Sequence, residues 1–181
     1  MSLIVVGTMA FDVIETPFGK ADKIVGGSAT YAAYTASNFV QPVQQVSIVG
    51  SDFPEAEMDA LRQRGVQLDG VVTVPGKKSF FWSGKYHLDM NTRDTLITDL
   101  NVLADFDPVL PESYKNTEFV MLGNLMPKLQ MKVIEQMQTR PKLIVMDTMN
   151  FWMETAWDDL MQVLQMIDVL LINDAEARQL T

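Results

Sequence analysis

Polar residues that directly follow short apolar runs are the residues of this sequence best placed to do chemistry. Asp12 comes shortly after the first run, Leu3–Val6, while Asp147 and Asn173 each follow a later run. In an open parallel sheet, ligands bind beyond the carboxyl ends of the strands, so such residues meet at one edge. Because a carboxylate accepts hydrogen bonds from hydroxyl groups, Asp12 is a candidate acceptor for vicinal hydroxyls of a ligand. A turn or capping aspartate is the alternative.

Two short motifs each have two uses. The pair Gly26-Gly27 permits positive φ and close approach of the backbone to a ligand, or it forms an ordinary turn before a helix. Asn173 and Glu176 carry side-chain oxygens just after the last apolar run, where a ligand of a parallel sheet would bind. The same spacing places Asn173 at a helix N-cap with Glu176 in the first turn, and one pair of residues serves both purposes. Asp52, after Gly50-Ser51, is favoured as a helix cap over a ligand contact.

Several common signatures are missing from the sequence. There is no G-x-x-x-x-G-K-[ST] phosphate loop, no G-x-G-x-x-G after the first strand and no G-x-S-x-G elbow. The single histidine, His87, is expected to be structural. The chain has no cysteine, which excludes disulfides, thiol nucleophiles and Cys-ligated metal sites.

The elements that must position these residues alternate between buried strands and helices. After Leu3–Val6, residues 28–39 have a helical period, residues 46–49 form another apolar run, and residues 54–64 are typical of a helix. Such alternation predicts a mostly parallel sheet with right-handed crossovers. In the later half the same pattern predicts strands at 119–122, 143–146 and 169–172 and helices at 128–138, 157–166 and from 175 onward.

Residues 71–100 break this pattern with short alternating pieces. Residues 71–74 and 79–83 are separated by Pro75-Gly76, which predicts a hairpin-like insertion with one covered face. The polar stretch that follows contains Asn91 and Arg93. Contacts to a substrate and a solvated loop are equally consistent with this stretch.

Four segments together resemble a known family. They are Val6-Gly7-Thr8-Met9-Ala10-Phe11-Asp12, Gly26-Gly27 before an Ala-rich helix, Val49-Gly50-Ser51-Asp52, and Asn173-Asp174-Ala175-Glu176. In this order they resemble the ribokinase-like (PfkB) carbohydrate kinases over essentially the whole chain. The resemblance implies an α/β fold, with a mostly parallel sheet flanked by helices and a small β-sheet lid insertion. Residues 1–181 then correspond to the N-terminal portion of such a kinase, with lid strands at about 11–25 and 71–100.

The resemblance also implies roles for individual residues. Thr30 or Tyr31 replaces an asparagine that the family usually has after the glycine pair, and Asn150 is a weaker candidate beside Asp147. Substrate-binding roles fall on Asp12, Gly26, Gly27, Thr30, Asn91 and Arg93, nucleotide or phosphate contacts on Asp147 and Asn173, and the Mg²⁺ role on Glu176.

The activity implied is transfer of the γ-phosphoryl group of ATP, with Mg²⁺, to a sugar hydroxyl. A nucleoside kinase and a non-catalytic sugar-binding or dimerisation module are the alternatives. The family's catalytic aspartate lies in a G-x-G-D motif, which this chain does not contain. We therefore expect the 181 residues alone to bind ligand weakly and not to turn over.

Charge and composition narrow the partners. With 14 basic and 23 acidic residues, the net charge of -9 disfavours nucleic acid and anionic membrane surfaces. No apolar run approaches the ~20 residues of a membrane helix, and with no cysteine the chain is expected to be cytoplasmic. The aromatic residues at 80–82 favour strand pairing, so a homodimer through the lid strands is also expected.

Overall fold

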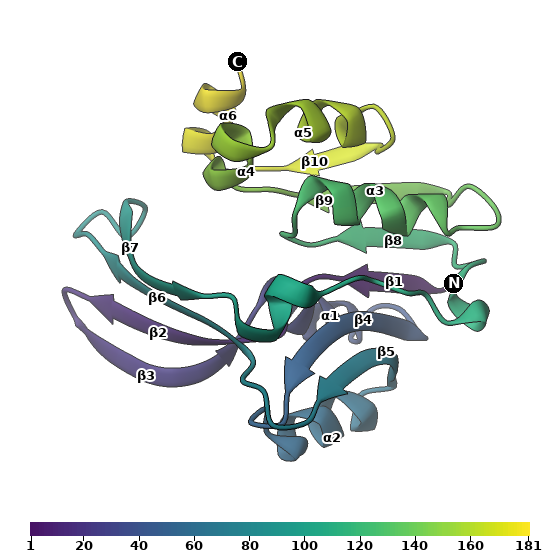
Figure 1. The fold of residues 1–181 in the computed structure, drawn as a ribbon, viewed down its shortest axis with the longest axis horizontal. Helices are drawn as coiled ribbons and strands as arrows, with labels where there is room; N and C mark the ends of the chain where they lie inside the picture. The colour runs from purple at the N-terminus through teal and green to yellow at the C-terminus, as the bar shows by residue number, and fades with distance from the viewer.

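The computed structural model describes residues 1–181 and contains a six-stranded main sheet with a smaller four-stranded sheet beside it (Figure 1). The strand order of the main sheet is β10-β9-β8-β1-β4-β5, and every neighbouring pair is parallel. The carboxyl ends of its strands therefore lie along one edge. The strands are β1 (Leu3–Val6), β4 (Val43–Gly50), β5 (Val66–Val74), β8 (Phe119–Leu122), β9 (Leu143–Asp147) and β10 (Val169–Leu171).

The main sheet buries side chains on both faces. Ile4, Val5 and Val6 of β1 are all fully buried, with Ile4 and Val6 in one apolar cluster and Val5 in the other. The cluster that contains Val5 also includes side chains of α1 and α2, and the cluster that contains Ile4 and Val6 includes side chains of α3, α4 and α5. The helices are α1 (Ser28–Ala36), α2 (Glu55–Gln63), α3 (Pro127–Glu135), α4 (Asn150–Thr155), α5 (Trp157–Leu164) and α6 (Asp174–Leu180), with 3₁₀ turns η1 (Asn101–Asp105) and η2 (Glu112–Tyr114). None of these helices combines the length and apolarity that crossing a membrane requires.

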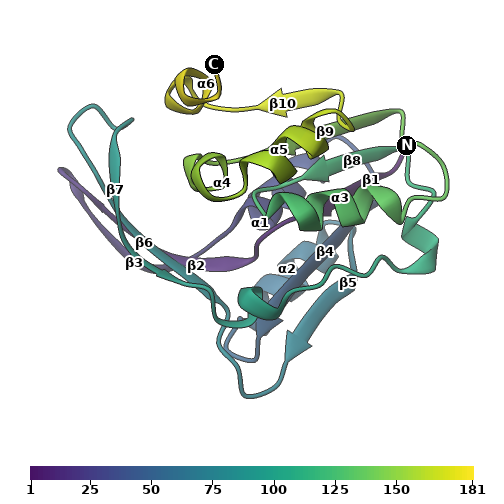
Figure 2. The same ribbon diagram turned by 45° about the horizontal axis from the view of Figure 1, so that its top comes forward.

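The smaller sheet lies at one side of the main sheet and curves away from it (Figure 2). Its order is β3-β2-β6-β7. The pairs β2–β3 and β6–β7 are antiparallel, whereas β2 and β6 run parallel. The predicted α/β fold with a small second sheet is therefore confirmed. The strands are β2 (Ala10–Thr16), β3 (Gly19–Gly26), β6 (Phe80–Tyr86) and β7 (Arg93–Asp99).

The predicted hairpin between residues 71–74 and 79–83 is wrong. Residues 71–74 belong to β5 and pair with β4 of the main sheet, from Ser47↔Val71 to Gly50↔Val74. The small sheet accordingly takes its later strands from residue 80 onward, and not from 71. β5 is the edge strand of the main sheet, and its side chains alternate between more buried and more exposed positions. The strands of a hairpin insertion show the same alternation, so the sequence pattern alone does not distinguish the two.

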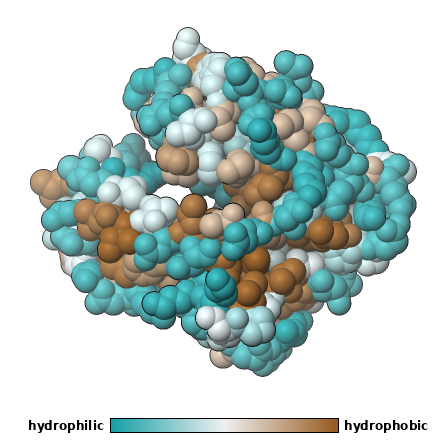
Figure 3. All heavy atoms as spheres, in the orientation of Figure 1, coloured by the Kyte–Doolittle hydropathy of each residue, from teal (hydrophilic) through white to brown (hydrophobic).

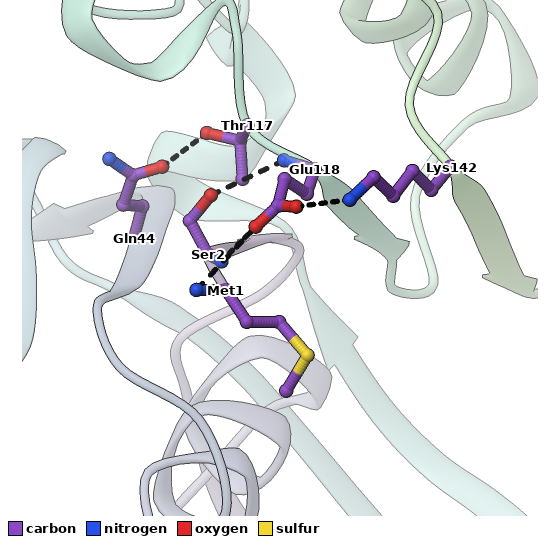
Figure 4. Close-up of polar contacts among 6 residues, drawn as sticks. All are labelled: Met1, Ser2, Gln44, Thr117, Glu118 and Lys142. Carbon is purple, nitrogen blue, oxygen red and sulfur yellow. Dashed lines mark hydrogen bonds and ion pairs between the residues drawn. The ribbon is translucent and has the colours of Figure 1, made fainter.

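A cluster of polar contacts joins the starts of three main-sheet strands (Figure 4). The Glu118 carboxylate accepts a hydrogen bond from the Ser2 backbone N–H at 3.2 Å and from Lys142 Nζ at 2.5 Å. It also lies 3.5 Å from the amino terminus at Met1. These contacts fix β1, β8 and β9 at their amino ends, opposite the edge where the carboxyl ends of the strands lie.

One part of the main sheet has no helix over it. A groove of about 430 Å³ lies along β1, β8, β9 and α1, and 11 of its 12 lining residues are hydrophobic. Leu143, at the start of β9, is 36% exposed there. The groove is an uncovered apolar face of the sheet.

Candidate functional site

A cleft of about 470 Å³ lies at the carboxyl ends of β8, β9 and β10. Its polar lining comes from the last residue of β9, from residues that follow β8, β9 and β10, and from one residue of the small sheet. The parallel order of the strands brings together residues that are far apart in the sequence. The polar lining residues are Asn124, Asp147, Thr148, Asn173, Glu176 and Arg93.

Asp147, the last residue of β9, carries a perturbed carboxyl group. Its Oδ1 atom is buried and has no hydrogen-bond partner. Burial, together with the smaller effect of the nearby negative charge of Glu176, raises the pKa of Asp147 to about 7. Both effects disfavour the charged carboxylate, so a cation or a hydrogen-bond donor supplied by a ligand would be favoured here.

Asn173 and Glu176 form a reciprocal capping box at the start of α6. Asn173 Oδ1 accepts from the Glu176 N–H, and Glu176 Oε2 accepts from the Asn173 N–H, each at 2.9 Å. The capping interpretation of this motif is confirmed. Glu176 is only 5% exposed and also lines the cleft, so the cap holds its carboxylate in place beside Asp147.

These two carboxylates fit the mode in which proteins hold Mg²⁺. The ion usually binds one or two carboxylates and completes its shell with waters and substrate phosphates. No group of three or more acidic or histidine side chains is placed to hold a metal alone. The unpartnered Oδ1 of Asp147 and the fixed carboxylate of Glu176 supply the oxygen atoms that such an ion needs.

Asp12 lies in β2 of the small sheet and depends on a glycine beside it. Its carboxylate accepts no hydrogen bond from the chain, and burial raises its pKa to about 6. A Cβ atom on Gly26 would lie 1.9 Å from Asp12 Oδ2, so only glycine leaves room for the carboxylate. Gly27 has φ 98°, and a Cβ there would lie 2.3 Å from the Thr8 carbonyl oxygen. The structure thus brings Asp12, Gly26 and Gly27 together.

Thr30 lies in the first turn of α1, just after the glycine pair. It is 2% exposed, and its Oγ1 atom is buried without a partner inside α1. Tyr31, the other residue expected to follow the glycine pair, is 54% exposed and donates its hydroxyl to the Val25 carbonyl at 3.3 Å.

The face of the small sheet that carries Asp12 is turned toward the cleft. Asp12 is the register partner of Trp82, and the Trp82 indole N–H donates to Thr95 Oγ1 at 3.4 Å. Thr95 and Arg93 are two residues apart in β7, so their side chains lie on the same face. Arg93 lines the cleft with Asp147 and Glu176. Figure 3 shows the molecule hollowed between the small sheet and the helices α4 and α6 above it.

The other lid residues do not line the cleft. Asn91 is exposed in a turn in which Asp89 Oδ1 accepts from the backbone N–H groups of Asn91, at 3.1 Å, and Thr92, at 2.9 Å. His87 pairs with Asp94 at 2.9 Å, also exposed, and touches no other predicted site residue.

Two asparagines follow strands of the main sheet, Asn124 after β8 and Asn150 after β9. Asn124, which follows β8, lines the cleft and accepts a hydrogen bond from the Trp152 indole N–H at 2.8 Å. It was not among the predicted site residues, although it too is a polar residue just after an apolar strand, as Asp147 is. Asn150 instead donates to Gln179.

The predicted capping role of Asp52 is wrong, because α2 has no side-chain cap. Asp52 Oδ1 accepts instead from Ser79, from the backbone N–H at 2.7 Å and the hydroxyl at 2.8 Å, where the chain leaves the main sheet.

Comparison with known proteins gives consistent matches over the whole chain. A family model described as pfkB family carbohydrate kinase matches residues 2–181. A cytidine kinase from Thermococcus kodakarensis is 23% identical over 185 residues, covering 100% of this chain and 64% of its own length.

Solved structures give the same picture of the fold. A nucleoside kinase from Methanocaldococcus jannaschii, described as an archaeal member of the ribokinase family, superposes with a TM-score of 0.78 at 17% identity. A nucleoside kinase from Burkholderia thailandensis in complex with inosine has a TM-score of 0.75 at 15% identity. These matches cover 99% and 98% of this chain, and 62% of each matched chain. The chain therefore spans less than two thirds of the length of these relatives.

Proposed function

Because this chain belongs to the pfkB family of carbohydrate kinases, we propose that the protein transfers the γ-phosphoryl group of ATP to a hydroxyl group of a sugar or nucleoside. The observation that carries this proposal is the unpartnered Asp12 carboxylate, which lies on the same face of the small sheet as Arg93, a residue that lines the cleft with Asp147 and Glu176. The Asp12 side suits hydroxyl groups, and the side of Asp147 and Glu176 suits a cation with phosphates.

Asp12 would orient the acceptor. Its ionised carboxylate accepts hydrogen bonds from two adjacent hydroxyl groups, and such charge-assisted bonds are stronger than neutral ones. Gly26 keeps the carboxylate accessible, and Gly27 allows the backbone to turn beside it. Holding the acceptor in one orientation lowers the entropic part of the barrier to transfer.

Asp147, Asn173 and Glu176 would serve the phosphate side. Mg²⁺ bound there would neutralise charge on the phosphates of ATP. Glu176, fixed by the capping box, and Asp147, with its free Oδ1, are the residues to hold the ion directly or through water. Asn173 lies beside them in the same lining.

Arg93 would add a positive charge from the lid. It lines the cleft from β7, opposite the two carboxylates. A guanidinium group binds phosphate oxygens through several N–H donors, so Arg93 would contact the phosphates more readily than the neutral acceptor. Asn91, held in the exposed turn, would approach the substrate only by movement of the lid.

The family is named for carbohydrates, whereas the matched relatives are named a cytidine kinase and nucleoside kinases. Either acceptor carries adjacent hydroxyl groups for Asp12 to bind. The names of the relatives favour a nucleoside as the acceptor.

Dimerisation through the lid is a further part of the proposal. All seven residues of β7 are exposed, and its outer edge is unpaired at the end of the small sheet. An exposed edge strand with apolar side chains favours pairing with another chain. Ile97→Lys on β7 should lower the mass measured by light scattering; an unchanged mass would remove the lid from consideration as an interface.

Kinetics of the protein expressed from its native gene test the assigned roles. Asp12→Asn should lower kcat/KM for the sugar or nucleoside by roughly 100-fold or more, because the charged carboxylate that orients its hydroxyl groups is lost. Glu176→Gln should instead shift the Mg²⁺ dependence of the rate to higher concentrations. Asp105→Asn, at an exposed position of η1, is the matched control. Equal activity in Asp12→Asn and wild type would contradict the proposal.

A further inference from the structure

We propose that Trp82 is a stacking platform for a nucleobase, so that the acceptor of this protein is a nucleoside and not a free sugar. The inference rests on the proposed function, because it takes Asp12 as the residue that binds the acceptor's hydroxyl groups. It adds a second contact, which determines what the acceptor carries beyond those hydroxyls.

Trp82 lies directly beside Asp12. The two are register partners in the parallel pair β2–β6, so their side chains point from the same face of the small sheet. Arg93 lies on this same face and lines the cleft. A ligand held by Asp12 therefore meets the indole ring with no intervening strand.

The indole ring extends outward along β6. A Cβ atom on Gly84 would lie 2.1 Å from Trp82 Cη2 and 2.4 Å from Cζ2, so the ring covers the Gly84 backbone. Gly84 is two residues beyond Trp82, a step of roughly 6.6 Å along a strand. The flat surface is thus displaced from the Asp12 carboxylate in one direction, as a base is displaced from the hydroxyl groups of its ribose.

The ring is also held in place. Its only polar atom, the indole nitrogen, donates to Thr95 Oγ1 at 3.4 Å. Gly84 supports one side of the ring, and Trp82 as a whole remains partly exposed. A fixed aromatic ring stacks with little loss of side-chain entropy, and every nucleobase offers a π face to it.

The surroundings of Asp12 favour a ligand that is polar at one end only. The row of register partners across the sheet is Ile24, Asp12, Trp82 and Thr98, and Phe80 lies on the same face two residues before Trp82. A free sugar presents hydroxyl groups on most sides and requires several polar partners. Asp12 is flanked in this row by Ile24 and Trp82, and a carboxylate between an apolar and an aromatic side chain suits a ribose with a flat base attached.

Tryptophan fluorescence tests the contact in the 181-residue chain. The chain has three tryptophans, and the double variant Trp152→Phe/Trp157→Phe leaves Trp82 as the sole emitter. Titration with cytidine and inosine should quench this emission to a saturating value, whereas ribose should bind without quenching. Nucleoside binding detected by calorimetry with no change in Trp82 emission would overturn the inference.

Affinities separate this inference from the proposed function. Trp82→Leu should weaken nucleoside binding by about tenfold and leave ribose binding unchanged, while Trp82→Phe keeps a ring and should retain most of the affinity. Unchanged ribose binding shows that the lid has kept its structure. A Trp82→Leu effect that is absent, or equal for ribose and nucleoside, would overturn the inference alone.

Asp12→Asn supplies the other comparison. It should weaken the binding of ribose and nucleosides alike, since both are taken to use the same carboxylate. If Asp12→Asn changes neither affinity, the proposed acceptor site is wrong and the inference falls with it. If the protein expressed from its native gene binds neither ribose nor a nucleoside in the calorimeter, both are contradicted.

Discussion

At the scale of single residues, two carboxyl groups of the site, those of Asp12 and Asp147, have oxygen atoms without a hydrogen-bond partner. Asp12 is half-buried, and Asp147 has one oxygen that is fully buried. Both arrangements cost folding free energy, because the charged form of each carboxyl group is disfavoured by burial. Groups of this kind mark a place where a ligand supplies the missing partner.

The pH dependence of acceptor binding follows from Asp12. Its pKa is raised to about 6, so the carboxyl group is protonated below that pH and charged above it. The charged form is the better acceptor for hydroxyl groups. Affinity for the acceptor should rise about tenfold from pH 5 to pH 7, as calorimetry at several pH values would show. The same series with Asp12→Asn should be flat, and a slope that persists would assign the effect to another group.

Two glycine substitutions distinguish the cost of a positive φ from the cost of a steric clash of the added Cβ atom. Gly27→Ala should lower the free energy of unfolding by roughly 2–4 kcal/mol, because φ is positive and the new Cβ meets the Thr8 carbonyl. Gly76→Ala is the matched control, since φ is also positive but the space around it is open, and it should cost only about 1 kcal/mol. Urea denaturation measures both. Equal losses would mean that the contact with Thr8 relaxes at no cost.

At the scale of elements, the connection between the two sheets depends on one hydrogen-bonded group. Ser79 is 1% exposed; its hydroxyl donates to Asp52 Oδ1 and accepts from the Gly50 N–H at 2.9 Å. These bonds hold the segment that leads from the main sheet into β6. The sequence marked Asp52 as a cap because Asp before a helix is common there, and the contact with Ser79 across 27 residues has no local signal.

Loss of the Asp52 contact should loosen that connection. Asp52→Ala should lower the free energy of unfolding by roughly 1–2 kcal/mol, because both Ser79 groups lose their acceptor. Asp105→Ala, an exposed aspartate without such a contact, should change it by less than about 0.5 kcal/mol. Chemical denaturation compares the two. Equal stability of both variants would show that water replaces the carboxylate without cost.

At the scale of the whole molecule, hydrophobic alternation was enough to predict the α/β order and the polar edge of the main sheet. Asp147, Asn173 and Glu176 meet in one cleft because parallel strands align their carboxyl ends. The burial of Thr30 was not predictable, because neighbouring helix positions differ only in the face they present. The assignment of 71–74 to the main sheet also required the tertiary pairing with β4.

The apolar groove beside β9 should be detectable in solution. The chain should bind the dye ANS there, and Leu143→Lys should reduce the fluorescence, because the lysine places a charge within the groove. Val109→Lys, at a residue that is 69% exposed and outside the groove, should leave it unchanged. Equal dye binding by both variants and the wild type would place the dye elsewhere.

Transfer of label from ATP is the most direct test of the proposed activity. The protein expressed from its native gene would be incubated with γ-labelled ATP, Mg²⁺ and a panel of sugars and nucleosides. We predict a labelled phosphate ester of an acceptor with adjacent hydroxyl groups, formed by the wild type and strongly reduced in Asp12→Asn. Label that stays on ATP, or appears only as inorganic phosphate with every acceptor, would contradict phosphoryl transfer to a hydroxyl held at Asp12.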